Sequence, residues 1–236
     1  MIRAVIFDWG GTLTPWHEID LLAQWYAYAE VYDPVNAASL AGRLRDAEMH
    51  RWRVQLLSNG QESTGALDRI FIDEGIDLGS DLHQRALENY LRFWDPHTLA
   101  DPQAAQLLRE LRAEGLAVGV LSNTLWPRSH HEAVFARDGL LPLIDAAAYT
   151  SEMPMAKPHV DAFTTIARML DVRPDEAVFV GDRIWDDILG AQQAGMKAIH
   201  IPHSRIPDEQ VPDGSAIPDA VIGELAEVLD IVRGWR

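Results

Sequence analysis

The chain contains no cysteine and only two lysines, Lys157 and Lys197, among its 236 residues. Without cysteine, it can form neither disulfides nor zinc–thiolate sites, and it has no thiol nucleophile. Acidic residues outnumber basic ones by 36 to 20, and the formal net charge of −16 argues against nucleic acid or an anionic membrane as a partner. No leader sequence is expected from the first residues, and no apolar run approaches the ~20 residues that span a membrane. We therefore expect a cytoplasmic protein whose oligomeric state the composition does not indicate.

Apolar runs alternate with helical patterns along most of the chain, which is typical of an α/β fold. Right-handed connections between such units predict a Rossmann-like, doubly wound parallel sheet. Strands are expected over residues 2–8, 116–121, 146–150, 177–181 and 196–201, and helices over 101–114, 158–171, 185–194 and 221–233.

Residues 17–94 differ from the rest because they show helical periodicity without an alternating strand pattern. About four helices are expected there. The sequence thus predicts an all-helical domain over residues 15–95, inserted into an α/β core made of residues 1–14 and 96–236. The segment 15–95 has no lysine.

Polar side chains follow three of the predicted strands, at the edge where the carboxyl ends of parallel strands meet. The first strand ends at Asp8, the second at Ser122 and Asn123, and the fourth at Asp182. Lys157 directly precedes a predicted helix. Together these residues suit phosphoryl transfer. They provide a nucleophilic carboxylate, a hydroxyl and an amide for phosphate oxygens, a cation, and further carboxylates for a metal. Turn formation and surface exposure are the structural alternatives for these residue types.

Taken in order, these segments resemble the four motifs of the haloacid dehalogenase-like hydrolase superfamily. The motifs match Asp8 to Leu13, Ser122, Lys157, and Gly181-Asp182 with Asp187. The resemblance covers residues 1–14 and roughly 97–205, and it implies that the helical insert is a cap.

The resemblance also implies a role for each matched residue. Asp8 would be the nucleophile that forms an aspartyl-phosphate, and Lys157 would neutralise the resulting cluster of charge. Phosphate would be bound by Gly10, Gly11, Ser122, Asn123 and Lys157. Mg²⁺ would be held by Asp8, the backbone carbonyl of Gly10, Asp182 and Asp187. Asp186 remains an alternative to Asp187, and a helix-start acid is an equally good interpretation of it.

Gly10 departs from the pattern of most phosphatases in this superfamily, which carry an aspartate two residues after the nucleophile. That carboxyl donates a proton to the leaving group and later activates water, a contribution of ~10²–10⁴-fold. His17 or Glu18 could replace it, although a surface position suits both residues.

The resulting expectation is a Mg²⁺-dependent phosphatase that acts on a small phosphorylated metabolite. A haloacid-type dehalogenase is one alternative, because Trp185-Asp186 resembles a pair found in those enzymes. The other alternative is a non-catalytic binding protein with the same fold. Because the insert has no lysine, a Schiff base from that segment is not expected.

Two aromatic patterns complete the expectations. Four tryptophans stand next to the motifs and predict an aromatic wall beside the site: Trp9, Trp16, Trp126 and Trp185. The pattern Ser129 to Glu132 matches a capping box, which would place His130 and His131 on the first turn of an exposed helix rather than at a metal.

Overall fold

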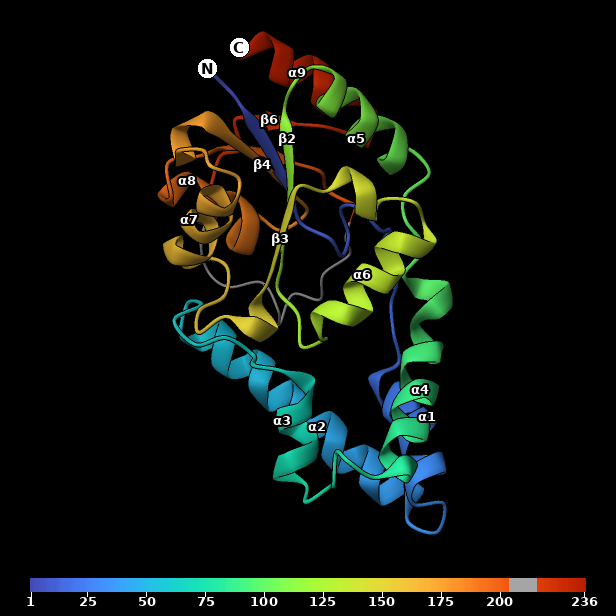
Figure 1. Cartoon of the computed structure of the whole chain (residues 1–236). Coiled ribbons are helices and arrows are strands. Elements are labelled where there is room, and N and C mark those ends of the chain that lie inside the picture. Colours follow the sequence, from blue (N-terminus) through green and yellow to red (C-terminus); the bar gives the residue numbers. More distant parts are fainter. Residues whose placement is uncertain (204–215) are drawn as a thin grey trace.

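A parallel sheet forms the centre of the larger of the two parts of the molecule (Figure 1). The computed structural model describes residues 1–203 and 216–236. Within them, six strands are arranged in the order β3-β2-β1-β4-β5-β6, and every neighbouring pair is parallel. The strands are β1 Ala4–Phe7, β2 Ala117–Ser122, β3 Ala146–Tyr149, β4 Ala177–Gly181, β5 Lys197–His200 and β6 Ala220–Val221. This order confirms the predicted doubly wound α/β fold.

The sixth strand was not expected from the sequence. The final helix was expected to begin at Val221, but Ala220 and Val221 pair with β5 instead. A 3-10 turn then covers Leu225–Glu227, and the last helix, α9, occupies Val228–Gly234. A two-residue strand has no periodicity of its own, so only its pairing with β5 reveals it.

Helices cover both faces of the sheet because side chains alternate along each strand. Val5 and Phe7 of β1 face one apolar cluster, and Ala4 and Ile6 face the other. The first cluster includes side chains of α5 Ala104–Ala113, α6 Arg128–Arg137 and α9, and the second includes side chains of α7 Val160–Met169 and α8 Gly190–Gln193. None of the helices in the described ranges combines the length and apolar character needed to cross a membrane.

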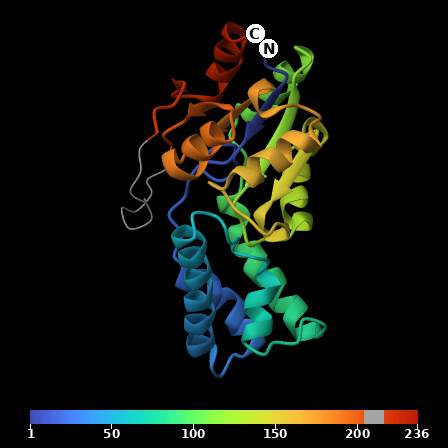
Figure 2. The same ribbon diagram turned by 90° about the vertical axis from the view of Figure 1, so that its left-hand side faces the viewer.

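The connection between β1 and α5 forms the second, helical part of the molecule (Figure 2). All of residues 15–95 are described, and they contain helices but no strand. The helices are α1 Leu21–Tyr32, α2 Ala37–Leu57, α3 Leu67–Asp73 and α4 Asp81–Trp94. Trp25, Tyr28, Phe71 and Tyr90 are buried at the centre of this helical insert. The all-helical content agrees with the sequence analysis, while the boundaries 15–95 of a separate domain stay a prediction.

Candidate active site

The site lies where the strand order of the sheet reverses, between β1 and β4. Phe7 is level with Val180, so Asp8 and Asp182 leave these two strands side by side. The Asp8 N–H donates to the Val180 carbonyl at 2.9 Å, which continues the pairing by one residue. Both carboxyl groups are buried. Ligands bind at such a reversal in open α/β sheets because the diverging connections leave a crevice there.

Lys157 joins two of the acids that the sequence had placed in separate motifs. Its Nζ donates to Asp8 Oδ1 at 2.7 Å and to Asp187 Oδ1 at 2.6 Å. Burial alone would lower the pKa of this fully buried lysine, but the carboxylates of Asp187 and Asp8 outweigh burial and raise it. Lys157 is therefore a fixed positive charge beside Asp8, and not the surface cation that was the alternative.

Two consecutive acids turn inward because the chain after β4 forms a π-helix, Ile184–Leu189. Asp186 and Asp187 are both buried. Widened helical turns of this kind are frequent at functional sites. The Asp187 carboxylate lies so close to Gly181 that a Cβ added at Gly181 would be 2.4 Å from its Cγ. Asp187 Oδ2 also accepts the N–H of Arg183 at 2.9 Å, which fixes the carboxylate at both oxygens.

Asp8, Asp182 and Asp187 form a group that suits a metal ion. Each offers one carboxylate oxygen, and these three atoms lie within 4.8 Å of one another. Buried, hard oxygen donors at this spacing fit a small divalent cation. Burial raises the pKa of Asp187, although Lys157 opposes the rise. A cation among these carboxylates would relieve the mutual repulsion that burial strengthens. Asp186 does not belong to this group of three, although the sequence could not separate it from Asp187.

Asn123 has a use that the sequence did not indicate. Its Oδ1 accepts the Lys157 N–H at 2.9 Å, and its Nδ2 donates to the Lys157 carbonyl at 3.1 Å. The side chain thus binds both backbone polar groups of Lys157, and phosphate binding by Asn123 stays a prediction. Ser122 lies at the end of β2 and is buried.

The loop after Asp8 is a tight turn closed by its own backbone. The Gly11 N–H donates to the Thr14 carbonyl at 2.8 Å, and Gly11 has a φ of 86°, which favours glycine. Apart from its chain neighbours, no described heavy atom lies within 4 Å of a Cβ built at Gly10. The space that the first atom of a side chain would occupy at residue 10 is therefore open.

Arg183 is a functional candidate that sequence reasoning missed. One of its guanidinium nitrogens lies 3.7 Å from Asp186 Oδ2, and the guanidinium carbon lies 5.3 Å from the centre of the Trp16 ring. Burial raises the pKa of Asp186, and Arg183 and Lys157 oppose that rise. The signal in the sequence was an arginine within an acidic motif. Gln55 of the helical insert is a second functional candidate that the sequence analysis missed, because nothing in the sequence around it indicated a contact with the site.

The aromatic wall forms only in part. The rings of Trp9 and Trp126 meet edge to face with centroids 5.5 Å apart, whereas Trp16 lies against Arg183. Trp126 also contacts Trp94 of the insert at 4.8 Å. Trp185 is half-buried. The wall is therefore mainly a contact between Trp9, Trp126 and the insert.

The histidine pair stands at the start of a helix, as expected, but the expected capping box and the exposure of His131 were wrong. Helix α6 begins at Arg128 after Pro127, and no side chain caps it. His131 is fully buried, stacks on Tyr149 with centroids 4.5 Å apart, and lies 3.0 Å from Thr124 Oγ1 through its Nε2. Burial lowers the pKa of His131 to about 3, so the ring stays neutral in the core. The helix packs this face against the sheet, which a local capping pattern does not specify.

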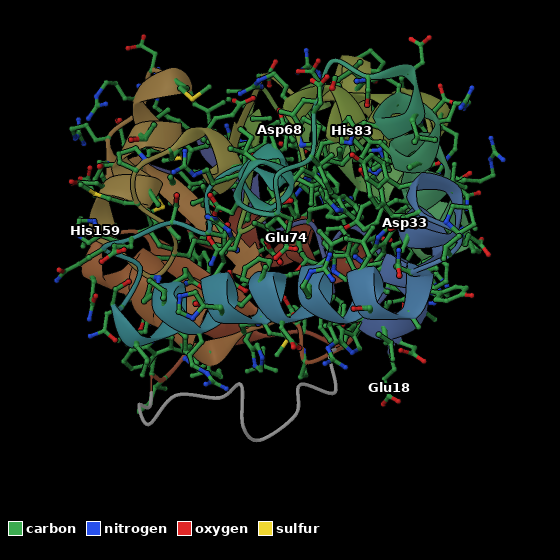
Figure 3. All side chains as sticks on the ribbon, turned by 90° about the horizontal axis from the view of Figure 1, so that it is seen from below. Glu18, Asp33, Asp68, Glu74, His83 and His159 are labelled. Carbon is green, nitrogen blue, oxygen red and sulfur yellow. The ribbon has the colours of Figure 1, made fainter. Side chains whose placement is uncertain are left out.

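His17 and Glu18, the suggested substitutes for the missing acid, are both exposed. His17 Nδ1 lies 3.1 Å from His97 Nδ1, and Figure 3 shows Glu18 extending away from the body of the molecule. This agrees with the interpretation of His17 and Glu18 as surface residues rather than as substitutes for the missing acid.

Comparison with known proteins agrees with this geometry. A family model described as haloacid dehalogenase-like hydrolase matches residues 2–195. The chain belongs to this family of hydrolases. The match includes all the residues of the site, from Asp8 to Asp187.

Relatives of this hydrolase differ in the reactions for which they are named. The chain is 28% identical over 234 residues to a glyceraldehyde 3-phosphate phosphatase from Methanopyrus kandleri, covering 99% of this chain and 98% of the relative. Its structure is similar to that of a HAD phosphatase from Thermococcus onnurineus, with a TM-score of 0.65, 25% identity and 99% coverage of both chains. It is also similar to a 2-haloacid dehalogenase from Pseudomonas syringae pv. tomato DC3000, with a TM-score of 0.68, 26% identity and complete coverage of both chains.

Proposed function

We propose that this hydrolase is a Mg²⁺-dependent phosphatase that acts on a small phosphorylated metabolite. The observation that carries the proposal is the group of three buried carboxylate oxygens from Asp8, Asp182 and Asp187, all within 4.8 Å of one another. A divalent cation bound there would draw charge from a phosphoryl oxygen as a Lewis acid. The phosphatases among the relatives support the same reaction class. The helical insert over residues 15–95 is proposed to act as a cap that limits which substrates reach Asp8.

In the proposed reaction, a carboxylate oxygen of Asp8 attacks phosphorus, and the bond to the leaving oxygen breaks with its electron pair. Lys157, at 2.7 Å from Asp8 Oδ1, offsets the negative charge that accumulates on the aspartyl-phosphate. Ser122 and the backbone of the Asp8 loop are proposed to bind the phosphoryl oxygens. Water then attacks the aspartyl-phosphate, which releases phosphate and returns Asp8.

The leaving oxygen must take its proton from a group other than residue 10, because Gly10 has no side chain. Good leaving groups, such as acyl or aryl phosphates, are therefore expected to react faster than alkyl esters. The hydrolysis of the aspartyl-phosphate lacks the same base, so this intermediate is expected to accumulate.

The test is a phosphatase screen over a metabolite panel, with Mg²⁺ and with EDTA. Mg²⁺-dependent release of phosphate, together with labelling of Asp8 by a phosphoryl donor, would support the proposal. Labelling of Asp8 also separates an enzyme from a binding protein of the same fold, since a non-catalytic protein would bind phosphate esters without forming a covalent adduct.

Two observations favour a second reaction. The chain is similar over its whole length to a 2-haloacid dehalogenase, and Gly10 lacks the phosphatase carboxyl. Dehalogenation also begins with attack by a carboxylate, but it needs no divalent cation. Release of halide from a 2-haloacid in EDTA would favour this reaction over phosphate hydrolysis.

A further inference from the structure

The end of α2 and the loop after it lie against the two segments that carry Lys157 and Asn123. Figure 1 shows this part of the insert next to the core, and Figure 3 shows His159 of the core beside the end of α2 that is far from Asp33. Five hydrogen bonds join residues 55–67 of the insert to residues 124–157 of the core, and in all five the acceptor is a backbone carbonyl, at 2.7–3.1 Å. They are Gln55 Nε2 to Lys157 O, Ala156 N to Gly60 O, Ser63 N to Pro154 O, Thr64 Oγ1 to Thr124 O, and Leu67 N to Leu125 O.

Gln55 is a side chain of the insert that forms a hydrogen bond with a residue of the site. It follows Glu48 and Trp52 on one face of α2, at spacings of four and three residues, and it is buried. Its Nε2 donates to the Lys157 carbonyl at 2.8 Å. The Gln55 side chain also favours a lower pKa for Asp186, although burial has the larger effect and raises that pKa. Gln55 therefore links the helical insert directly to the backbone of a site residue.

Gly60 allows the backbone of the loop to approach the core. Its φ is +73°, and a Cβ built on it would lie 2.2 Å from the Ala156 carbonyl oxygen and 3.1 Å from the His159 backbone nitrogen. Both obstacles are backbone atoms, which cannot rotate away as a side chain can. Any larger residue at this position must therefore separate the loop from residues 156–159.

We propose that the segment Gln55–Thr64, the docking segment, positions Lys157, so that the lysine is aligned with Asp8 only while this segment is docked. The proposal rests on the proposed function for the role of Lys157 in the reaction. Asn123 holds the Lys157 peptide from the core side, and the docking segment holds it and the preceding residue from the other. Gln55 and Gly60 are thus positioning residues, because they act on Lys157 and do not touch the reacting atoms.

A pair of glycine variants tests the docking segment. Gly60 and Gly75 both lie in the insert with left-handed backbone, but no described heavy atom lies within 4 Å of a Cβ built at Gly75. Gly60→Ala and Gly75→Ala therefore share the backbone strain, and only the first clashes with the core. A second pair is Gln55→Met, which removes the donor to the Lys157 carbonyl, and Gln84→Met, which removes an amide donor to the Leu78 carbonyl at an exposed position of α4, outside the docking segment.

Two measurements are made on the full-length protein. The first is kcat for a phosphate ester with Mg²⁺, normalised to the folded fraction. We expect Gly60→Ala and Gln55→Met to lower kcat about tenfold or more, since small displacements of a reacting geometry have effects of this size. The two control variants should keep the wild-type value. The second is amide hydrogen exchange, in which Gly60→Ala should speed exchange at both Ala156 and Lys157 relative to Gly75→Ala.

The outcomes separate this inference from the proposed function. If the wild-type protein hydrolyses no phosphate ester, the proposed function is contradicted. The rate of hydrogen exchange at the Lys157 amide, compared between Gly60→Ala and Gly75→Ala, then tests by itself whether the docking segment positions Lys157. If Gly60→Ala leaves the Lys157 amide protected, the docking segment does not position Lys157. If the wild type is active and Gln55→Met has the same kcat, the inference is likewise overturned. Gln55→Met also provides the test if Gly60→Ala does not fold.

Discussion

Replacing Gly10 by aspartate tests whether the missing carboxyl limits this hydrolase. The backbone of Gly10 is not in the left-handed region, and no described heavy atom other than its chain neighbours lies within 4 Å of an added Cβ. The substitution therefore costs neither backbone strain nor a steric clash at its first atom. It places a carboxyl two residues after Asp8, in a loop whose shape is fixed by the hydrogen bond from Gly11 to Thr14.

The expected gain in kcat depends on the size of the general acid–base effect and on how much of it is lost if the new carboxyl is misplaced. A positioned general acid and base contributes ~10²–10⁴-fold. A misplacement of about 1 Å can remove ~10²-fold of such an effect. Since the loop has not been selected to hold a carboxyl, we expect Gly10→Asp to raise kcat on alkyl phosphates about tenfold or more. Aryl phosphates, whose leaving groups need little protonation, should gain much less.

The assay compares an aryl and an alkyl phosphate ester in the presence of Mg²⁺. Gly10→Asn is the matched control, because its side chain has nearly the same size and cannot supply the proton. A rise in alkyl turnover for Gly10→Asp but not for Gly10→Asn would support the reasoning. If Gly10→Asp is no faster than the wild type, and the wild type cleaves both esters equally well, then the proton comes from another group and the reasoning is refuted.

Three further predictions concern the acids and their surroundings. Asp182→Asn should weaken Mg²⁺ binding, measured by tryptophan fluorescence, and lower kcat at least tenfold; full activity in EDTA would contradict it. Gly181→Ala should displace the Asp187 carboxylate, because its Cβ would lie 2.4 Å from Asp187 Cγ, and should lower kcat about tenfold or more in a variant that still melts cooperatively. Burial raises the pKa of Glu48 above its usual 4.5 despite hydrogen bonds to its carboxylate, so its contribution to stability is full below that value and is lost as pH rises. Glu48→Gln should therefore reduce the difference in Tm between about pH 5 and about pH 8, and an unchanged difference would show that Glu48 does not titrate in this range.

The sequence by itself determined the α/β core and the residues that meet at its edge. The apolar strands β1 and β4, of four and five residues, are buried on both faces and have a strong pattern, and polar residues at their carboxyl ends must share one edge of a parallel sheet. The sequence alone thus predicted that Asp8 and Asp182 lie close together. The helical content of the insert was also readable, since its apolar residues recur at helical spacing over 12–21 residues in α1 and α2.

Tertiary structure alone decided how the remaining groups meet. The π-helix after β4 turns both Asp186 and Asp187 inward, and periodicity based on an ordinary helix cannot show this. His131 is buried because α6 packs that face on the sheet, whereas its local sequence matched an exposed helix start. Gln55 and Gly60 reach Lys157 and Ala156 across about one hundred residues of chain, a contact that no local pattern encodes. Local propensity and strand order come from neighbours in sequence, while these contacts depend on how separate elements pack.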